Sequence, residues 1–320
     1  MGDYSAFIKS SSDLETTHEV RRAFYIENVM RRSKESTPYL DKAKALYTTL
    51  TSSTTVPDDI LKLKSLRDAF LDAAGVSRKT REHLDDKDME NILADFVKNV
   101  IQPMGDKYVD EITYRYLMAL GEQLGGTMRN VIGKMGQAKL TRQIVAQLNV
   151  RNIEFDYHLS KGKWISGASF AIDDADDIKA LRWTSGSYNR TLVYNTTVPG
   201  VAGDYKNVDI VMLNAFCGGI NKKKDIEPLF ADSRNLVVMG ELKSGMDRAG
   251  GDEHWKTGVH SLNRIRDKYK HSYIFFIGAT IEHNMGGEIF TMLKDNRLDF
   301  AANLHNENQL SNLCGWLVEK

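Results

Sequence analysis

The sequence predicts a mixed α/β fold with a helical N-terminal part and a C-terminal part built on a mixed sheet. Apolar residues recur about one helical turn apart, without strand-like alternation, to roughly residue 105. After a further long helical stretch, short apolar or alternating runs appear that are rich in Val, Ile, Tyr and Phe. The 320 residues are enough for one large or two ordinary domains with a substantial core.

Three helices are predicted in the first part. The first begins with Thr37 as N-cap and Pro38 at the first helical position. The second begins near Pro57 and ends at Gly75, a residue suited to a C-cap. The third carries apolar residues at helical spacing, namely Met89, Ile92, Phe96 and Val100.

A long helical stretch follows from residue 110 to residue 148, and Gly125 and Gly126 are expected to interrupt it. Between Gly121 and Arg151 this region holds one acid, Glu122, and five basic residues, which are Arg129, Lys134, Lys139, Arg142 and Arg151. The basic residues form either an ordinary solvated helix face or a local surface for a phosphate backbone.

Five runs in the C-terminal part are predicted strands: "NIEFDYHL", "RTLVYNTTV", "NVDIVMLN", "NLVVMGELK" and "SYIFFIGATI". A helix, "DEHWKTGVHSLNRIRDKY", is predicted between the last two, and "NQLSNLCGWLVEK" is predicted to close the chain as a helix.

Composition is that of a soluble globular protein, with 42% hydrophobic and 27% charged residues. Basic and acidic residues balance at 43 each, so a DNA-binding protein with this sequence must concentrate its basic residues locally. The chain has 2 cysteines, no signal-peptide pattern and no run of membrane-spanning length. We therefore expect a cytoplasmic protein with no membrane partner.

The chemistry centres on "VVMGELKSG". Side chains alternate across a strand, so Glu241 and Lys243 share one face. A hard cation such as Mg²⁺ takes oxygen ligands, commonly one or two carboxylates with phosphate and water. Asp209, an acid within the apolar run "NVDIVMLN", supplies the second carboxylate. An acid in such a run is costly to bury unless it is paired or bound to a metal.

Acid-x-lysine alone is a weak signal. It also occurs from Asp85 to Lys87 and from Asp177 to Lys179. Only Glu241-x-Lys243 follows an apolar strand-like run and has a strand-borne acid upstream. The alternative to a nuclease site is a surface ion pair that contributes about 0–1 kcal/mol and no chemistry.

Two further candidates follow the strand. Asp247 lies just beyond the acid-x-lysine, and His254 lies near the start of the next helix. The glycine-bearing loop between them could bring His254 within reach of a water molecule, as a general base requires. A histidine near a helix start can equally be structural.

The acid in one strand and the acid-x-lysine in a later one resemble the PD-(D/E)XK nuclease core, although Val208 replaces the proline. The blocks "STPYL", "LGGTMRN", "KNVDI", "GELKSGMDRAGGDEHWKT", "IGATIEH" and "LCGWL" are similar, in the same order, to the AvaI/BsoBI family of type II restriction endonucleases. The similarity runs from about Asp13 to the C-terminus. It implies a restriction-endonuclease-like sheet flanked by helices, with a DNA-embracing helical domain at residues 1–105 and a catalytic domain at residues 106–320.

The resemblance also implies an activity. The family's members are homodimers that surround double-stranded DNA and cleave the degenerate palindrome CYCGRG with Mg²⁺. They cut after the first C, which leaves 5′ overhangs with 5′-phosphate ends. A cognate methyltransferase is expected in the host.

Carried over residue by residue, the family's catalytic acids are Asp209 and Glu241, its lysine is Lys243 and its proposed general base is His254. The Leu242 carbonyl is a further metal ligand in this assignment. For DNA contact, the resemblance points to Asp247 and Lys79, with Arg78 and Arg81 as competing cations beside Lys79. Arg129 is a further candidate for DNA contact, and Glu122 is a candidate additional acid.

Two other functions stay open at this stage. A DNA-repair or junction-resolving nuclease could use the same core without recognising a sequence. A non-catalytic DNA-binding protein could reuse the fold, although the presence of Asp209, Glu241 and Lys243 together argues against it.

Overall fold

The computed structural model describes residues 4–201, 203–220, 223–246 and 248–320, without the side chains of residues 223 and 248–254. The chain forms two compact units. The sheet unit comprises the residues up to Tyr25 together with Val131–Lys320, and the helical unit comprises Ile26–Asn130. The domain boundary placed between residues 105 and 106 from the sequence stays a prediction.

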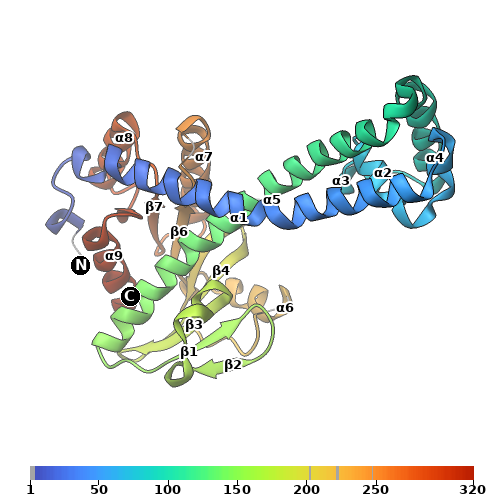
Figure 1. Ribbon diagram of the computed structural model, residues 1–320. Helices are drawn as coiled ribbons and strands as arrows, with labels where there is room; N and C mark the ends of the chain where they lie inside the picture. The colour runs from blue at the N-terminus through green and yellow to red at the C-terminus, as the bar shows by residue number, and fades with distance from the viewer. Residues whose placement is uncertain (1–3, 202, 221–222, 247) are drawn as a thin grey trace. The chain divides into compact units, whose positions relative to one another are not determined.

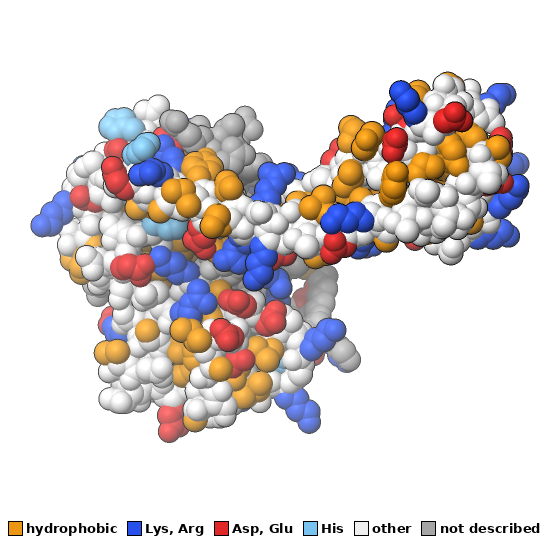
Figure 2. All heavy atoms as spheres, in the orientation of Figure 1, with side chains coloured by type: hydrophobic (Ala, Val, Ile, Leu, Met, Phe, Trp, Pro, Cys, Tyr) orange, Lys and Arg blue, Asp and Glu red, His pale blue; other side chains and the backbone are white. Residues whose placement is uncertain are grey.

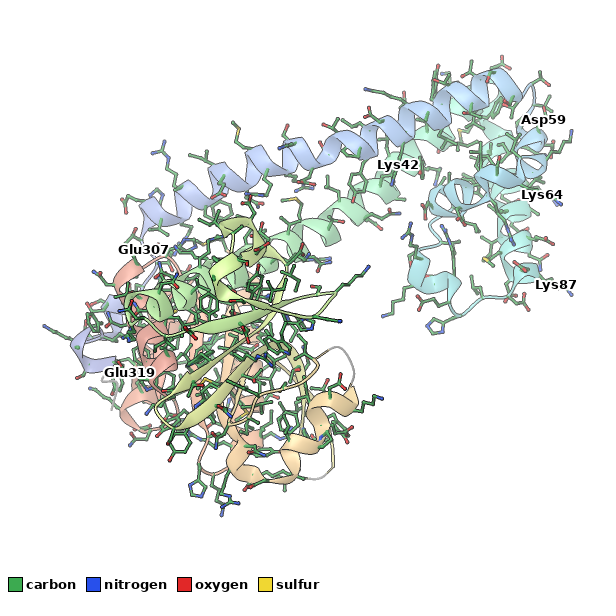
Figure 3. All side chains as sticks on the ribbon, turned by 90° about the horizontal axis from the view of Figure 1, so that it is seen from below. Lys42, Asp59, Lys64, Lys87, Glu307 and Glu319 are labelled. Atoms are coloured by element: carbon green, nitrogen blue, oxygen red, sulfur yellow. The ribbon has the colours of Figure 1, made fainter. Side chains whose placement is uncertain are left out.

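The helical unit packs around an apolar core that includes Leu50, Phe70, Ile101 and Ile112. Two long helices, α1 (His18–Ser53) and α5 (Tyr108–Val150), each contribute to both units. Between them lie α2 (Arg67–Ala73), α3 (Arg78–Arg81) and α4 (Asp86–Phe96), with a π-helical turn at Val97–Ile101. Figure 3 labels Asp59, Lys64 and Lys87 on the surface of this unit.

Three helix predictions are wrong in detail, and one predicted C-cap is confirmed. The helix expected from Pro57 starts instead as two 3₁₀ helices, Pro57–Lys62 and Lys64–Leu66, and α2 begins only at Arg67. Pro38 lies inside α1 rather than at its start, and α5 continues through Gly125 and Gly126. Proline and glycine weaken a helix interior by about 3 and 1 kcal/mol, which long helices can tolerate. Gly75 does end α2: its φ is 85°, and the Val76 amide donates to the Leu71 carbonyl at 2.8 Å, as in a Schellman motif.

The sheet unit is built on an eight-stranded sheet with the order β2-β1-β3-β4-β5-β6-β7-β8 (Figure 1). Neighbours from β2 to β6 are antiparallel, and β6, β7 and β8 run parallel, which confirms the predicted mixed sheet. In chain order the strands are Phe155–Leu159, Trp164–Ser166, Ile178–Ser185, Tyr188–Pro199, Tyr205–Leu213, Leu236–Lys243, Tyr273–Gly278 and Phe300–Asn303.

Helices cover both faces of the sheet. One face packs against α7 (Arg248–Arg266) and α8 (His283–Lys294), through residues such as Val259 and Ile289. The other packs against the second half of α5 and against α9 (Glu307–Glu319), through residues such as Ile144 and Leu313. A short helix, α6 (Lys223–Ile226), precedes β6. Alternate residues of β5 and β6 therefore enter two different apolar layers.

The basic stretch of α5 is largely committed to ion pairs inside the sheet unit. Lys139 and Arg151 pair with Glu307 and Glu319 at 2.6 and 3.3 Å, and Figure 3 labels these acids on α9. Lys134 and Arg142 each lie 3.5 Å from an acid near β3, Asp177 and Asp176 respectively. These four cations thus fit the interpretation of the stretch as an ordinary charged helix face, and not as a surface for a phosphate backbone.

Charges of both signs are mixed over the visible face of the sheet unit in Figure 2. In the part of the chain that the structure describes, each helix is too short or too polar to cross a membrane.

Candidate active site

The candidate site lies where β5 and β6 part. Their antiparallel pairing reaches Ile210 opposite Gly240. One residue further along each strand lie Asp209 and Glu241, on the sheet face that carries Val211 and Met239. Because facing residues on adjacent strands are close neighbours, the pairing brings the two carboxylates together.

At this point the Asp209 side chain, instead of the β5 backbone, provides the hydrogen-bond acceptor for β6. Its Oδ2 accepts a hydrogen bond from the Leu242 amide at 3.0 Å. The N–H and C=O of a strand residue point to the same side, so the Leu242 carbonyl is also directed toward β5. The next residue, Lys243, turns its carbonyl to the other side, where it accepts from the Ala279 amide at 2.7 Å.

Lys243 links the two acids. Its Nζ forms a close ion pair with Glu241 Oε1 and lies 3.8 Å from Asp209 Oδ2. The three side chains differ in exposure: Glu241 is 9% exposed, Asp209 26% and Lys243 35%. The cluster therefore opens to solvent through Asp209 and Lys243, with Glu241 as its buried end.

Helix α7 forms the wall behind Glu241. A Cβ added at Gly258 would lie 2.4 Å from Glu241 Oε1 and 2.8 Å from its Cγ. Only a residue without a side chain lets the helix backbone approach the carboxylate this closely.

Burial raises the pKa of Glu241, and the negative charge of Asp209 raises it further. Lys243 lowers this pKa without cancelling the increase. For Lys243, desolvation lowers the pKa, but the two carboxylates outweigh it and the net direction is upward. The ionised cluster thus has an excess of negative charge in a partly buried place.

These groups fit a hard divalent cation. The two carboxylates and the Leu242 carbonyl, which is directed toward β5, supply oxygen donors. A cation would also offset the repulsion between the carboxylates that raises the pKa of Glu241. Among the described residues, no group of three or more His, Cys, Asp or Glu side chains is arranged to hold a metal. A cation here would therefore need the backbone, water or phosphate for its remaining ligands, which is usual for Mg²⁺.

Comparison with known proteins decides the family. The family model described as "Restriction endonuclease BsobI" matches residues 4–320. The type II restriction enzyme BsoBI of Geobacillus stearothermophilus is 37% identical over 319 residues, covering 97% of this chain and 96% of that protein. The type II restriction enzyme AvaI of a Nostoc species is 34% identical over 322 residues, covering 99% of both.

The chain belongs to the BsoBI restriction endonuclease family. It is a type II site-specific deoxyribonuclease, as the resemblance of its sequence blocks implies, and it therefore binds DNA. Enzymes of this type generally use a divalent metal.

Two site candidates of this restriction endonuclease lie outside the described residues. Asp247 is outside them altogether, and His254 belongs to α7 while its side chain is not described. The helix nevertheless has a defined relation to the cluster, because Gly258 on the same helix contacts Glu241.

The candidate DNA-contacting cations of the helical unit differ in their surroundings. Arg78 and Lys79 are exposed on α3 and make no ion pair within the described residues. Arg81 instead bonds to the Val76 carbonyl at 2.9 Å and to Asp68 at 3.2 Å, and it pairs closely with Asp72. Arg81 is therefore occupied inside the unit, which leaves Arg78 and Lys79 as the available cations.

Arg129 and Glu122 both lie exposed on the part of α5 that belongs to the helical unit. Arg129 forms no ion pair with any residue that the structure describes, unlike the four cations that follow it on the helix. The roles of both residues stay predictions.

The other two acid-x-lysine pairs have local structural roles. Asp85 caps α4, since its side chain accepts from the Asp88 amide at 2.8 Å. At the start of β3, Lys179 donates to the Asn195 carbonyl at 3.2 Å, while the exposed Asp177 pairs with Lys134.

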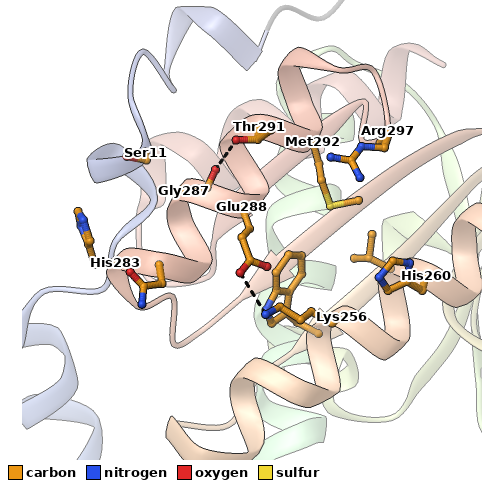
Figure 4. Close-up of a pocket in the computed structure, with 12 residues that line it drawn as sticks. Ser11, Lys256, His260, His283, Gly287, Glu288, Thr291, Met292 and Arg297 are labelled. Atoms are coloured by element: carbon orange, nitrogen blue, oxygen red, sulfur yellow. Dashed lines mark hydrogen bonds and ion pairs between the residues drawn. The ribbon is translucent and has the colours of Figure 1, made fainter.

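A pocket of about 630 Å³ lies elsewhere on the sheet unit, between α7 and α8 (Figure 4). Its lining includes Trp255, Met292 and the ion pair of Lys256 with Glu288 at 3.1 Å. It contains none of Asp209, Glu241 and Lys243, so this pocket is not the proposed catalytic centre.

Sequence reasoning missed Gly258. The signal was a glycine within an otherwise helical pattern, which costs about 1 kcal/mol relative to alanine and so indicates a packing reason. Its partner could not be inferred, because the contact joins residues on different elements.

Proposed function

We propose that this restriction endonuclease cleaves both strands of CYCGRG after the first C, in a Mg²⁺-dependent reaction that leaves 5′ overhangs with 5′-phosphates. The observation that supports the catalytic part is the cluster of Asp209, Glu241 and Lys243, with its excess of negative charge. The hexamer rests on the colinear resemblance of the whole chain.

In this proposal Asp209, Glu241 and the Leu242 carbonyl would hold Mg²⁺ beside the scissile phosphate. When bound, Mg²⁺ supplies Lewis-acid stabilisation of the phosphate charge and activation of water. Lys243 is the only cationic partner of the cluster among the described contacts, and its raised pKa keeps it protonated at neutral pH. It can therefore stabilise the charge that develops on the phosphate and lower the pKa of the attacking water.

His254 is the proposed general base. It would orient the attacking water and accept its proton, while the water oxygen forms a bond to phosphorus. The phosphorus–O3′ bond breaks, the O3′ leaves with a proton from solvent, and the phosphate stays on the 5′ end. A base must lie within hydrogen-bond reach of that water, directly or through another water.

Recognition of the degenerate position has a simple physical basis. Purine N7 accepts a hydrogen bond in both A and G, so one lysine can read either purine. Lys79 is exposed and unpaired among the described residues, which suits this role. Asp247 could accept from a cytosine N4 elsewhere in the site.

We propose a homodimer as the active form. A palindrome presents the same half-site twice, and two-fold symmetry places one catalytic cluster on each strand. A cognate methyltransferase would protect the host's own CYCGRG sites.

The experiment is digestion of a plasmid of known sequence with Mg²⁺ or with EDTA, followed by sequencing of the ends. We expect discrete fragments that begin with YCGRG and only with Mg²⁺. Fragments with another terminal sequence would contradict the proposed site, and cleavage in EDTA would contradict the metal. A smear would instead favour a nuclease that does not recognise a sequence.

A further inference from the structure

The segment that leaves β6 connects both sides of the proposed site. It begins after Lys243, runs through Ser244, Gly245 and Met246, and enters α7 after residue 247. On α7, Gly258 contacts Glu241. A shift of this short segment would therefore move Lys243 and the wall behind Glu241 relative to each other.

Side-chain hydroxyls hold the backbone of this segment. The Tyr25 hydroxyl donates to the Met246 carbonyl at 2.9 Å. The Thr280 hydroxyl donates to the Gly245 carbonyl at 3.2 Å and lies 2.8 Å from the Met246 sulfur. The Met246 side chain is 2% exposed and packs into the core, so both the backbone and the side chain of this residue are fixed.

The two anchors share a common support. Thr16, just before α1, accepts from the Ile281 amide at 2.9 Å and donates to the Ala279 carbonyl at 2.9 Å. Arg21, one turn before Tyr25, pairs with Glu282 at 3.0 Å. The start of α1 is thus attached to the same β7–α8 connection that carries Thr280.

We propose that Tyr25 is a positioning residue of the active site, whose hydroxyl fixes the Met246 carbonyl and thereby the alignment of Lys243 with Glu241. The inference rests on the proposed roles of Asp209, Glu241 and Lys243. Tyr25 does not touch the cluster itself and acts through the backbone of the segment.

Loss of the Tyr25 hydroxyl should affect the cleavage rate more than the stability of the fold. The residue is 45% exposed, so removal of its hydroxyl takes away one hydrogen bond and little packing. A single such hydrogen bond makes only a small net contribution to stability. A displacement of about 1 Å in a reacting group, in contrast, can reduce the rate about a hundredfold.

The test compares Tyr25→Phe and Thr280→Val with a matched control. Tyr47 is on the same helix, is 44% exposed and makes no hydroxyl hydrogen bond to the described residues, so Tyr47→Phe is that control. The measurements are the single-turnover cleavage rate of a CYCGRG duplex as a function of Mg²⁺, duplex binding in Ca²⁺, and Tm.

We expect Tyr25→Phe to reduce the saturated rate about tenfold and to raise the Mg²⁺ concentration needed for half the maximal rate, with duplex binding and Tm close to wild type. Thr280→Val should change the rate in the same direction, and Tyr47→Phe should leave it unchanged. Should Tyr25→Phe fold poorly, Thr280→Val decides by the same criteria.

A Tyr25→Phe rate equal to that of Tyr47→Phe would overturn the inference. So would a rate loss explained by the unfolded fraction, with an unchanged Mg²⁺ dependence. Glu241→Ala in the same assay separates the proposed catalytic site from the role of Tyr25. Full activity of Glu241→Ala would reject the proposed site. An inactive Glu241→Ala together with a fully active Tyr25→Phe would reject only the role of Tyr25.

Discussion

Glu241-x-Lys243 and Asp177-x-Lys179 have the same spacing in the same sheet and very different surroundings. Glu241 is 9% exposed, faces Asp209 across the strand pair and packs on Gly258. Asp177 is 68% exposed, and its partner Lys134 is 66% exposed. Lys179 bonds to backbone carbonyls instead of to an acid of its own motif.

The comparison teaches that spacing alone does not make a site. What distinguishes the pair on β6 is burial together with a second carboxylate, because both raise the pKa of Glu241 and leave negative charge that a cation can offset. At Asp177 solvent screens the pair, which contributes about 0–1 kcal/mol.

The largest contrast should come from removing the acid at each position. Glu241→Ala should reduce Mg²⁺-dependent cleavage on the order of a thousandfold, since it removes a proposed ligand of the cation that stabilises the reacting phosphate. Asp177→Ala should cleave at the wild-type rate. Single-turnover assays on one duplex measure both, and equal rates for the two variants would remove the distinction between the sites.

A smaller loss should follow from crowding Glu241 without removing it. In Gly258→Ala the new methyl group would overlap the carboxylate, so we expect a rate loss of about ten- to a hundredfold from its displacement. Gly287→Ala on α8 is the control, since a Cβ there meets nothing within 4 Å. If Gly258→Ala cleaves as fast as Gly287→Ala, the close contact has no catalytic importance.

The pH dependence of stability should also distinguish Glu241. Its folded-state pKa is raised, so the folded protein holds this proton more tightly than the unfolded chain. The resulting stabilisation is complete below the unfolded pKa and is lost as pH rises through the folded pKa. Glu241→Gln, which stays neutral, should therefore have a higher Tm than wild type at neutral pH in EDTA.

That Tm difference should vanish at low pH, where Glu241 is protonated in both states. Cleavage by the wild type should in turn fall as pH decreases through the raised pKa, because only the ionised carboxylate can hold a cation. Thermal unfolding and rate measurements across pH check both statements. A Glu241→Gln protein that is less stable than wild type at neutral pH would show that the carboxylate is not under electrostatic strain.

The smallest effect on stability is expected for Lys79, and the neighbouring Arg81 on α3 should differ from it. Lys79→Ala should change stability by less than about 0.5 kcal/mol, because Lys79 is exposed and unpaired among the described residues. It should nevertheless relax discrimination at the degenerate base pair. Arg81→Ala should lower stability by about 1–3 kcal/mol, since it leaves Asp72 and the Val76 carbonyl without this donor.

Cleavage of duplexes with every variant of the hexamer measures base discrimination by Lys79→Ala. Denaturant unfolding measures the stability of Lys79→Ala and Arg81→Ala. An unchanged choice at the degenerate position in Lys79→Ala would reject Lys79 as its reader.

Much of the fold was predictable because strong local patterns agree with it. The apolar runs that form β1 and β4 to β7 were recognised as strands, and the helix before β7 was recognised from its spacing. Three strands were missed: β2 and β8 have only 3 and 4 residues, and β3 carries Lys179 and Arg182 within it. Helix α8 was also missed, since Gly286 and Gly287 weaken its local signal.

The site was partly predictable for a similar reason. Asp209 and Glu241 occupy consecutive strands, and the pairing that joins such strands brings their acids together. The contacts of Gly258 and Tyr25 depend on how helices pack on the sheet, which local sequence does not encode. The helix start placed at Thr37 was wrong, because α1 begins at His18 and continues through Pro38.

The central claim is that Asp209 and Glu241 hold the divalent cation. Isothermal titration of Ca²⁺, as a non-cleaving substitute for Mg²⁺, into the enzyme–duplex complex tests it most directly. The account predicts binding in the wild type and in Asp177→Ala, and loss of that binding in Asp209→Ala and Glu241→Ala. Wild-type cation binding by the Glu241→Ala complex would contradict it.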